Sequence, residues 1–297
     1  MLQARRRLRC EQHPSPFAVP RHFTGMTTTR AAILDTAAGE QHATRSTAMA
    51  VPHIILLGYG VTDSLQLTVE SQRILARFGS AYAVGLPPNL EGFLKSQRVK
   101  VTDLAPSLAP GREFADAYLE IAHTLVTRAA SERPVIFLAP GNPLMFNAIG
   151  RYLAMEGRRL GLTVQSAAAV SPLDMVISGL GLDVSTFGLQ VFDATRLVAR
   201  RIALNPSVPA LLMSVDTFGA KAVPGAGATL DLSPLTAHLA RCYPPGHPAS
   251  VITLDSAGMR LRGVAIEDLA AGAAPLPPGS HLFLDIVRAQ PAQGTPA

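Results

Sequence analysis

The sequence of 297 residues is short of cysteine and of aromatic residues, and these shortages exclude several classes of protein. It has two cysteines, Cys10 and Cys242, no tryptophan, and only 5% aromatic residues. Two cysteines cannot build a disulfide framework or a four-cysteine zinc site, so we expect a cytoplasmic protein without a structural metal. Apolar residues, by contrast, make up 48% of the chain, which is typical of an α/β protein with a large core.

Beyond the N-terminal part of the chain, positive and negative charges nearly balance. The formal net charge is +5, and residues 1–50 supply +4 of it, from seven arginines against three acidic residues. No lysine- and arginine-rich stripe with interleaved aromatics follows, so nucleic acid is not expected as a partner. No apolar run approaches the roughly 20 residues that span a bilayer, so a membrane is not expected as a partner either.

The two ends of the chain have the composition of disordered tails. Residues 1–50 show no sustained period and few large apolar side chains, and residues 289–297 are rich in Pro, Ala and Gln. The arginine-rich, acid-poor N-terminal segment is also typical of a transit peptide, and a chain that begins at Met26 or Met49 is an equal alternative. The tail after Arg288 shows no evident precursor segment, so we expect any peptide substrate to be a separate chain.

Between the tails, apolar runs of strand type alternate with helical patterns. This alternation predicts a mostly parallel, doubly wound sheet in the first half. The expected strands and helices, in order, are strand 53–58, helix 66–78, strand 81–85, a proline-rich link at Pro87 and Pro88, helix 112–131, strand 134–139, a helix ending near 160, and strand 163–167.

The pattern changes near residue 170. Ser171-Pro172 has the form of a helix N-cap followed by proline at the first helical position. Beyond it, strands and short helices are less regularly ordered, which predicts a mixed sheet. We therefore expect a first α/β domain over residues 51–170 and a second over residues 171–288.

A glycine turn follows the first strand. The apolar run 54–57 suits a parallel strand buried on both faces, and Gly58 and Gly60 come directly after it. Glycine allows a sharp turn and the close approach of a ligand, so this strand end is a natural binding site. The dinucleotide fingerprint requires a third glycine where Asp63 stands, and residues 81–85 hold no acidic residue, so a nicotinamide-dependent dehydrogenase is disfavoured.

Four spaced segments resemble motifs of the tetrapyrrole methylase family. They are LGYGVTDSLQLT at 57–68, PGNPLMFN at 140–147, AAAVSPLD at 167–174 and YPPGHPASVI at 243–252. The resemblance implies an S-adenosylmethionine-dependent methyltransferase with two α/β domains, the cofactor in the cleft between them, and a homodimeric assembly. Val61-Thr62 and Ala168-Ala169 depart from the family pattern.

Within the family, residues 189–215 look closest to the borosin-type enzymes, which methylate backbone amides of peptides. The resemblance implies cofactor-binding residues at the positions that match the motifs. These are Gly58, Gly60, Gly141, Asn142, Pro143, Phe146, Val170, Ser171, Met213 and Pro248. Each has a local alternative as well, since Gly141 and Pro143 can shape a turn, Met213 can fill a core and Ser171 can cap a helix.

Tyr118 and Arg112 are the candidate catalytic residues for a peptide acceptor. An amide must lose its proton around the time of attack, and a phenolate or a positioned Tyr–Arg pair is a means of arranging that. Tyr118 matches the helical tyrosine of borosin-type enzymes, because Ile121 and Ala122 follow it. Arg112 lies six residues before Tyr118, where the motif spacing is four, and the upstream tyrosines of that motif have no match.

Other interpretations stay open at this point. Tyr118 can also be a core-facing helix residue, and His247 is a further candidate for a base or a substrate contact. The acceptor can be a small molecule or a peptide, with a tetrapyrrole carrying several carboxylates as the alternative. A cofactor-binding scaffold without transfer activity is the rival from another class.

Overall fold

The computed structural model describes residues 51–62, 66–225, 227–255, 257–270 and 276–287. Asp63, Cys10 and the two predicted tails lie outside the described residues, so the interpretations given for them stay predictions. Within the described ranges, no helix is long and apolar enough to cross a membrane.

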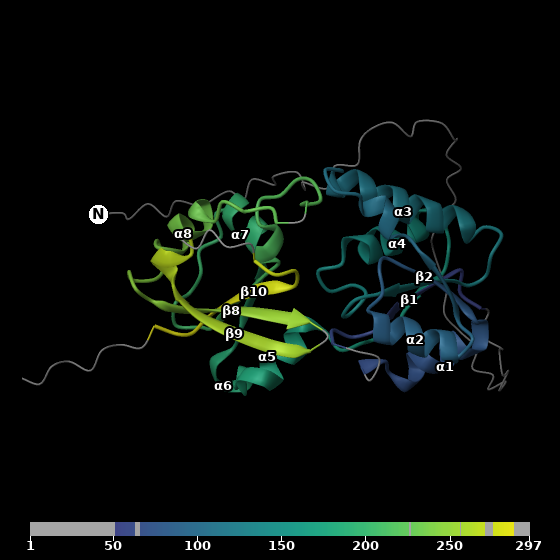
Figure 1. Ribbon diagram of the computed structural model, residues 1–297, viewed down its shortest axis with the longest axis horizontal. Helices are drawn as coiled ribbons and strands as arrows, with labels where there is room; N and C mark the ends of the chain where they lie inside the picture. Colours follow the sequence, from purple (N-terminus) through teal and green to yellow (C-terminus); the bar gives the residue numbers. More distant parts are fainter. Residues whose placement is uncertain (1–50, 63–65, 226, 256, 271–275, 288–297) are drawn as a thin grey trace, which may run out of the picture. The chain divides into compact units, whose positions relative to one another are not determined.

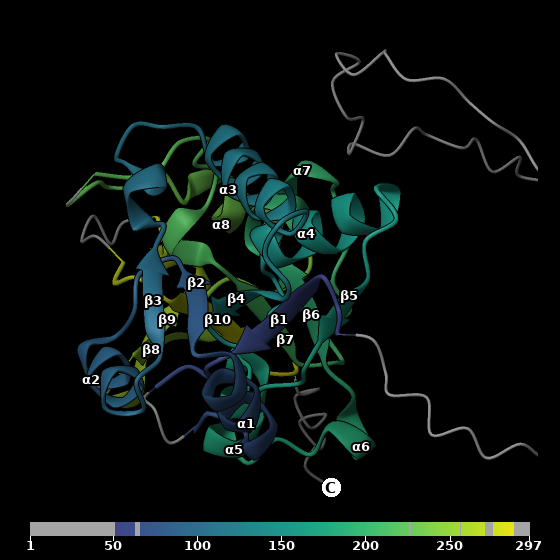
Figure 2. The ribbon, with the colours of Figure 1, turned by 90° about the vertical axis from the view of Figure 1, so that its right-hand side faces the viewer.

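The first half of the chain forms a parallel sheet, as predicted. Its strands lie in the order β3-β2-β4-β1-β5, and every pairing between them is parallel. Figure 2 shows the strands side by side in this order. The strands are β1 (Ile54–Gly58), β2 (Ser80–Ala83), β3 (Lys100–Asp103), β4 (Val135–Ala139) and β5 (Val164–Ser166). All residues of β1 and β4 are buried, which confirms the expectation of a strand covered on both faces.

Helices cover both faces of this sheet (Figure 1). Ile55 and Leu57 of β1 face helices α1 (Val69–Phe78) and α2 (Pro88–Ser96). The alternate residues, Ile54 and Leu56, face helices α3 (Phe114–Arg128) and α4 (Ala148–Arg159). The two buried clusters thus follow the two-residue period of the strand, and the sheet is doubly wound.

The prediction of a proline-rich link after residue 85 is wrong. Pro88 is the first residue of α2, where a missing N–H costs nothing, and Leu90 and Leu94 bury one face of this short helix. The edge strand β3 and the 3-10 helix η2 (Ala105–Leu108) follow. No residue of β3 is fully buried, so the strand lacks the apolar run by which strands are found in sequence.

The second half forms a separate, mixed sheet, also as predicted. Its order is β6-β7-β10-β8-β9, with β6 and β7 parallel and the other pairs antiparallel. The strands are β6 (Gln190–Asp193), β7 (Ala210–Met213), β8 (Pro248–Asp255), β9 (Gly258–Ala265) and β10 (Ser280–Leu284). The helices are α5 (Pro172–Leu180), α6 (Val184–Phe187), α7 (Ala194–Ala199) and α8 (Ser233–Leu239), with 3-10 turns η3 (Val215–Thr217) and η4 (Ile266–Asp268).

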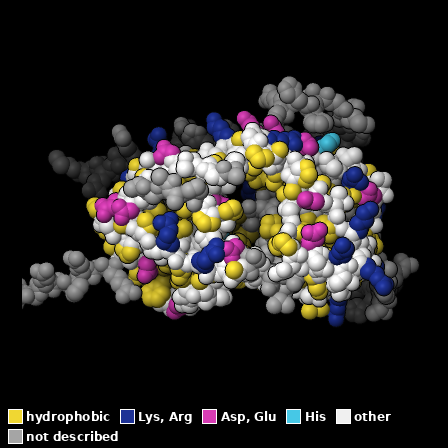
Figure 3. Space-filling model, viewed as in Figure 1, with side chains coloured by type: hydrophobic (Ala, Val, Ile, Leu, Met, Phe, Trp, Pro, Cys, Tyr) yellow, Lys and Arg dark blue, Asp and Glu magenta, His cyan; other side chains and the backbone are white. Residues whose placement is uncertain are grey.

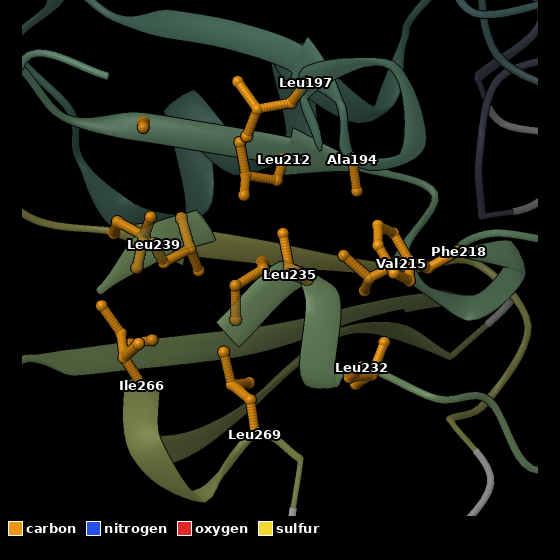
Figure 4. Close-up of a cluster of buried hydrophobic side chains, with 14 of the residues drawn as sticks. Ala194, Leu197, Leu212, Val215, Phe218, Leu232, Leu235, Leu239, Ile266 and Leu269 are labelled. Carbon is orange, nitrogen blue, oxygen red and sulfur yellow. The ribbon is translucent and has the colours of Figure 1, made fainter. Parts of the chain in front are cut away.

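The two faces of the second sheet pack against different helices. Leu212 of β7 meets Leu197 of α7 and Leu235 of α8 in the larger cluster (Figure 4). The opposite face carries Leu211 and Met213, and Val176 of α5 packs there. The division of the chain into domains at residues 170 and 171 stays a prediction.

Candidate functional site

The carboxyl ends of the neighbouring strands β1 and β4 lie at the topological switch point of the sheet, where the strand order reverses. The helix after β1 lies on one face of the sheet and the helix after β4 on the other, although the two strands are neighbours. In open α/β sheets this arrangement leaves a crevice at the carboxyl ends of the two strands, where ligands bind. The glycine turn of β1 lies at this point.

Glycine at residue 58 is required by close packing. A Cβ atom on Gly58 would lie 2.0 Å from the carbonyl oxygen of Gly141 and 2.4 Å from the Cβ of Ala169. The backbone of Gly141 also donates a hydrogen bond of 2.8 Å to the carbonyl of Gly60. The structure therefore brings together the loops after β1, β4 and β5, which carry three of the four matched segments.

The loop after β4 is shaped by its own backbone and side chains. Gly141 has φ 62°, and Asn142 Oδ1 accepts a hydrogen bond of 3.0 Å from the N–H of Leu144. Phe146 has φ 51° although it is not glycine, and its side chain is 43% exposed. A left-handed aromatic residue is uncommon in proteins and marks a position that its surroundings impose. Pro143 is buried beneath this loop.

Two residues that sequence reasoning missed support these loops. A Cβ on Gly150 would lie 1.9 Å from the carbonyl oxygen of Pro143, so glycine lets α4 approach the loop. The amide oxygen of Gln66 accepts the N–H groups of Val61 and Thr62, at 2.5 and 3.0 Å. The isolated glycine in a helical pattern was a usable signal, whereas nothing in the sequence distinguishes Gln66.

The loop after β5 ends in a capping box, which confirms the predicted N-cap. The Ser171 side chain accepts the N–H of Asp174 at 3.3 Å, and an Asp174 carboxylate oxygen accepts the N–H of Ser171 at 2.7 Å. Ser171 is 4% exposed, and its hydroxyl donates to the same carboxylate at 2.6 Å. Ser171 is thus committed to the cap, while Val170 before it is half-buried.

Met213 and Pro248 lie at different ends of the second sheet. Met213 ends β7, is 2% exposed, and belongs to a buried cluster against which Val61 of the first glycine turn packs. Pro248 begins β8 and is exposed. Its neighbour Ala249 pairs with Leu284, and Leu284 pairs with the first residue of β7. Pro248 therefore lies at the start of β7, whereas Met213 lies at its end. The cluster that contains Met213, but not Pro248, therefore adjoins the loop after β1 through Val61.

The two candidate catalytic residues flank the start of α3 without pairing with each other. Arg112 forms an ion pair with Glu120, and its guanidinium also donates to the carbonyl of Ser107 at 3.1 Å. Tyr118 is half-buried and stacks on Phe114 with ring centroids 5.5 Å apart. Burial raises the pKa of Tyr118, so its phenol stays protonated at neutral pH.

The segment that carries Arg112 is tied to the second half of the chain. Gly111 donates a hydrogen bond of 2.9 Å to the carbonyl of Val223, and Val223 donates one of 2.8 Å to the carbonyl of Arg112. Phe114 adds a third, of 2.9 Å, to the carbonyl of Lys221. The glycine- and alanine-rich loop near residue 222 therefore fixes the backbone just before α3.

His247 has structural partners rather than a free ring. It is 7% exposed, its Nε2 lies 3.1 Å from the carbonyl oxygen of Asp285, and its ring lies 4.9 Å from that of Tyr243. These contacts are at the Pro248 end of β8. The placement gives no support to His247 as a base at the glycine turn.

Charge is dispersed around these elements. On the face shown in Figure 3, basic and acidic side chains are interspersed, and ion pairs such as Arg128–Glu132 and Arg159–Glu156 join neighbouring turns of helices. Among the residues that the structure describes, no group of three or more His, Cys, Asp or Glu side chains is arranged to hold a metal ion. The candidate site therefore consists of backbone groups, small residues and apolar side chains.

Solved structures of other proteins share this fold. The crystal structure of uroporphyrin-III C-methyltransferase from Thermus thermophilus superposes with a TM-score of 0.56 at 20% identity, covering 78% of this chain and 91% of that one. The crystal structure of diphthine synthase gives a TM-score of 0.51 at 17% identity, covering 78% and 90%. At these identities the likeness concerns the fold, which agrees with the two sheets described above.

Sequence relatives point to the same group of proteins. A methyltransferase/ribosomally synthesized type I borosin cyclic peptide precursor from Mycena rosella is 21% identical over 56% of this chain, which spans 42% of that protein. A type II borosin precursor from Phlebiopsis gigantea is 20% identical over 65% of this chain, which spans 35% of it. Residues 53–258, well over half of the chain, match the family of tetrapyrrole (corrin/porphyrin) methylases, and the chain belongs to this family.

Proposed function

We propose that this chain is a methyltransferase that uses S-adenosylmethionine. The observation that carries the proposal is the meeting of three matched loops at the ends of β1, β4 and β5, in a chain that belongs to the tetrapyrrole methylases. A structure of the same fold, uroporphyrin-III C-methyltransferase from Thermus thermophilus with a TM-score of 0.54, is complexed with S-adenosylhomocysteine.

The residues at these loops fit such a cofactor. The loops at the ends of β1, β4 and β5 carry glycine and small residues, which let a ligand contact the backbone directly. Phe146 offers an exposed aromatic face to the uncharged part of a nucleoside, and Met213, which is buried, we assign to the apolar backing of the site. We assign Gly58, Gly60, Gly141, Asn142 and Val170 to the same wall, with Ser171 and Pro143 holding the shape of their loops.

The chain's own residues then have to orient the acceptor and exclude water. The cofactor supplies the methyl group on a sulfonium, and transfer is an in-line displacement that needs the acceptor atom aligned with it. Tyr118 remains a phenol at neutral pH, so a standing phenolate base is disfavoured, and we assign it a hydrogen bond to the acceptor instead. Arg112, held by Glu120, would position the start of α3.

We further propose a peptide amide as the acceptor. One support is the set of borosin-type relatives. The other is the ion pair between Arg112 and Glu120, because a polycarboxylate such as a tetrapyrrole would need Arg112 as a free cation. The chain spans less than half of these relatives, and the acceptor that we propose is a separate peptide chain.

The proposal is tested by incubating the protein with methyl-labelled S-adenosylmethionine and two acceptors, an uncharged peptide and a reduced uroporphyrin. We expect label in the peptide and none in the tetrapyrrole. Tyr118→Phe, which removes the hydrogen bond to the acceptor, should lower the rate of transfer about ten- to a hundredfold while S-adenosylhomocysteine affinity stays within a few-fold. Tyr152→Phe is the matched control, because Tyr152 packs on the same cluster from α4. Transfer to the tetrapyrrole alone would contradict the acceptor assignment, and unchanged turnover of Tyr118→Phe would contradict the role given to Tyr118.

A further inference from the structure

The end of β7 is held in a conformation that its sequence does not favour. Ser214, directly after Met213, has φ 60° and ψ 44°, in the left-handed region that residues with a Cβ adopt reluctantly. The chain turns there into η3. Such a residue persists only where neighbouring groups impose its conformation.

The ring of His281 makes the contact that imposes it. His281 lies on β10, next to β7, and its Nδ1 is 3.2 Å from the backbone nitrogen of Ser214. The ladder between the two strands ends at the pair Leu282 and Leu212, and the ring accepts the N–H of Ser214, two residues beyond this pair. His281 is 6% exposed, and water cannot readily replace it as the acceptor.

The hydrogen bond also fixes the protonation state of the ring. A backbone N–H can only donate, so Nδ1 carries no proton and the ring is neutral with its proton on Nε2. Burial lowers the pKa of His281 to about 4, partly opposed by a hydrogen bond to the Ser280 backbone, which agrees with a neutral ring at neutral pH. The acceptor is therefore permanently available.

A second contact fastens the same turn from the other side. The carboxylate of Asp216 in η3 accepts the N–H of Gly279 at 2.8 Å, just before β10 begins. Thr217 closes the turn with a 3.3 Å hydrogen bond to the carbonyl of Ser214. Of these contacts, only the one from His281 joins Ser214 itself to β10.

We propose that His281 is a positioning residue for the methyl-donor site. By holding the N–H of Ser214, its ring fixes the end of β7 and with it the placement of Met213 in the buried cluster against which Val61 of the first glycine turn packs. The inference rests on the proposed function, because Met213 acts on a cofactor only if the chain binds one. His281 itself contacts Ser214, the residue next to Met213, and is not assigned a contact with the cofactor.

The test compares full-length His281→Leu, His281→Asn and Ser214→Gly with the wild-type chain. Leucine removes the acceptor, whereas asparagine supplies an amide oxygen close to the position of Nδ1. Glycine adopts the left-handed conformation without cost, so Ser214→Gly should make the ring less necessary. We expect His281→Leu to bind S-adenosylhomocysteine about tenfold more weakly, because the released turn would have to be ordered when the ligand binds. His281→Asn and the double variant His281→Leu/Ser214→Gly should recover most of this affinity.

A second measurement, amide exchange, separates the positioning role of His281 from the proposed function. Amide exchange in the peptide covering Met213–Thr217 should accelerate in His281→Leu and return toward the wild-type rate in His281→Asn. If His281→Leu bound the ligand like the wild type, or lost affinity without rescue by asparagine or glycine, the positioning role would be refuted. If the wild-type chain bound no S-adenosylhomocysteine, the proposed function would fail, and with it the positioning role, even if the exchange rates showed the turn to be clamped as described.

Discussion

Replacement of Gly58 by alanine tests the close approach of β1 and β4 on which the site depends. The added Cβ would lie 2.0 Å from the Gly141 carbonyl oxygen, far inside van der Waals contact, and 2.4 Å from the Cβ of Ala169. Both obstacles belong to the backbone or sit directly on it, so no flexible side chain can yield. Overpacking of this kind costs about 1–3 kcal/mol, and we expect the upper end.

For a chain of this size, a loss of about 3 kcal/mol corresponds to a melting temperature lower by roughly 6–12 °C. Thermal unfolding followed by circular dichroism measures it. Gly92→Ala is the matched control, because Gly92 lies inside α2 with nothing within 4 Å of its added Cβ, and alanine should stabilise the helix by about 0.5–1 kcal/mol. A melting temperature of Gly58→Ala equal to that of the wild type would refute the reasoning.

Three further predictions concern the same elements. Ser171→Ala removes the capping box and should lower the free energy of unfolding in urea by about 1 kcal/mol, and an unchanged value would mean that the cap is dispensable. Gly150→Ala forces α4 away from the Pro143 carbonyl and should lower the melting temperature as Gly58→Ala does, whereas tolerance would show that the loop can move. The pKa of His281 is about 4 in the folded chain and near 6.5 in the unfolded chain, so the unfolded chain binds more protons between these pH values. The free energy of unfolding should therefore fall by up to about 3 kcal/mol as the pH drops from 6.5 to 4. His281→Asn should flatten that slope in urea titrations, and an equal slope would contradict the assignment.

The sequence was sufficient for the parts of the fold that follow a strong local rule. The run at 54–57 is apolar at every position because β1 is buried on both faces, and Ser171-Pro172 carries all the chemistry of an N-cap. Alternating strands and helices then predicted the doubly wound sheet. Helix α2 is not predicted from the sequence because Pro87 and Pro88 together suggest a link between elements, although proline is favourable at the first helical position.

The candidate site was harder to predict, because its geometry depends on residues far apart in the chain. That Gly58 must be glycine follows from the positions of Gly141 and Ala169, which no local pattern reveals. The contact between His281 and Ser214 joins residues 67 positions apart. The register of β8 likewise separates Pro248 from Met213, and a motif match alone carries no information on register.

The central claim is tested most directly by calorimetric titration of the protein with S-adenosylhomocysteine, with NADH as the control ligand. The account predicts saturable binding of S-adenosylhomocysteine and none of NADH, and weaker binding to Gly58→Ala under conditions where that variant is folded. Binding of neither ligand to the folded wild-type chain would contradict the assignment of a methyl-donor site to the ends of β1, β4 and β5.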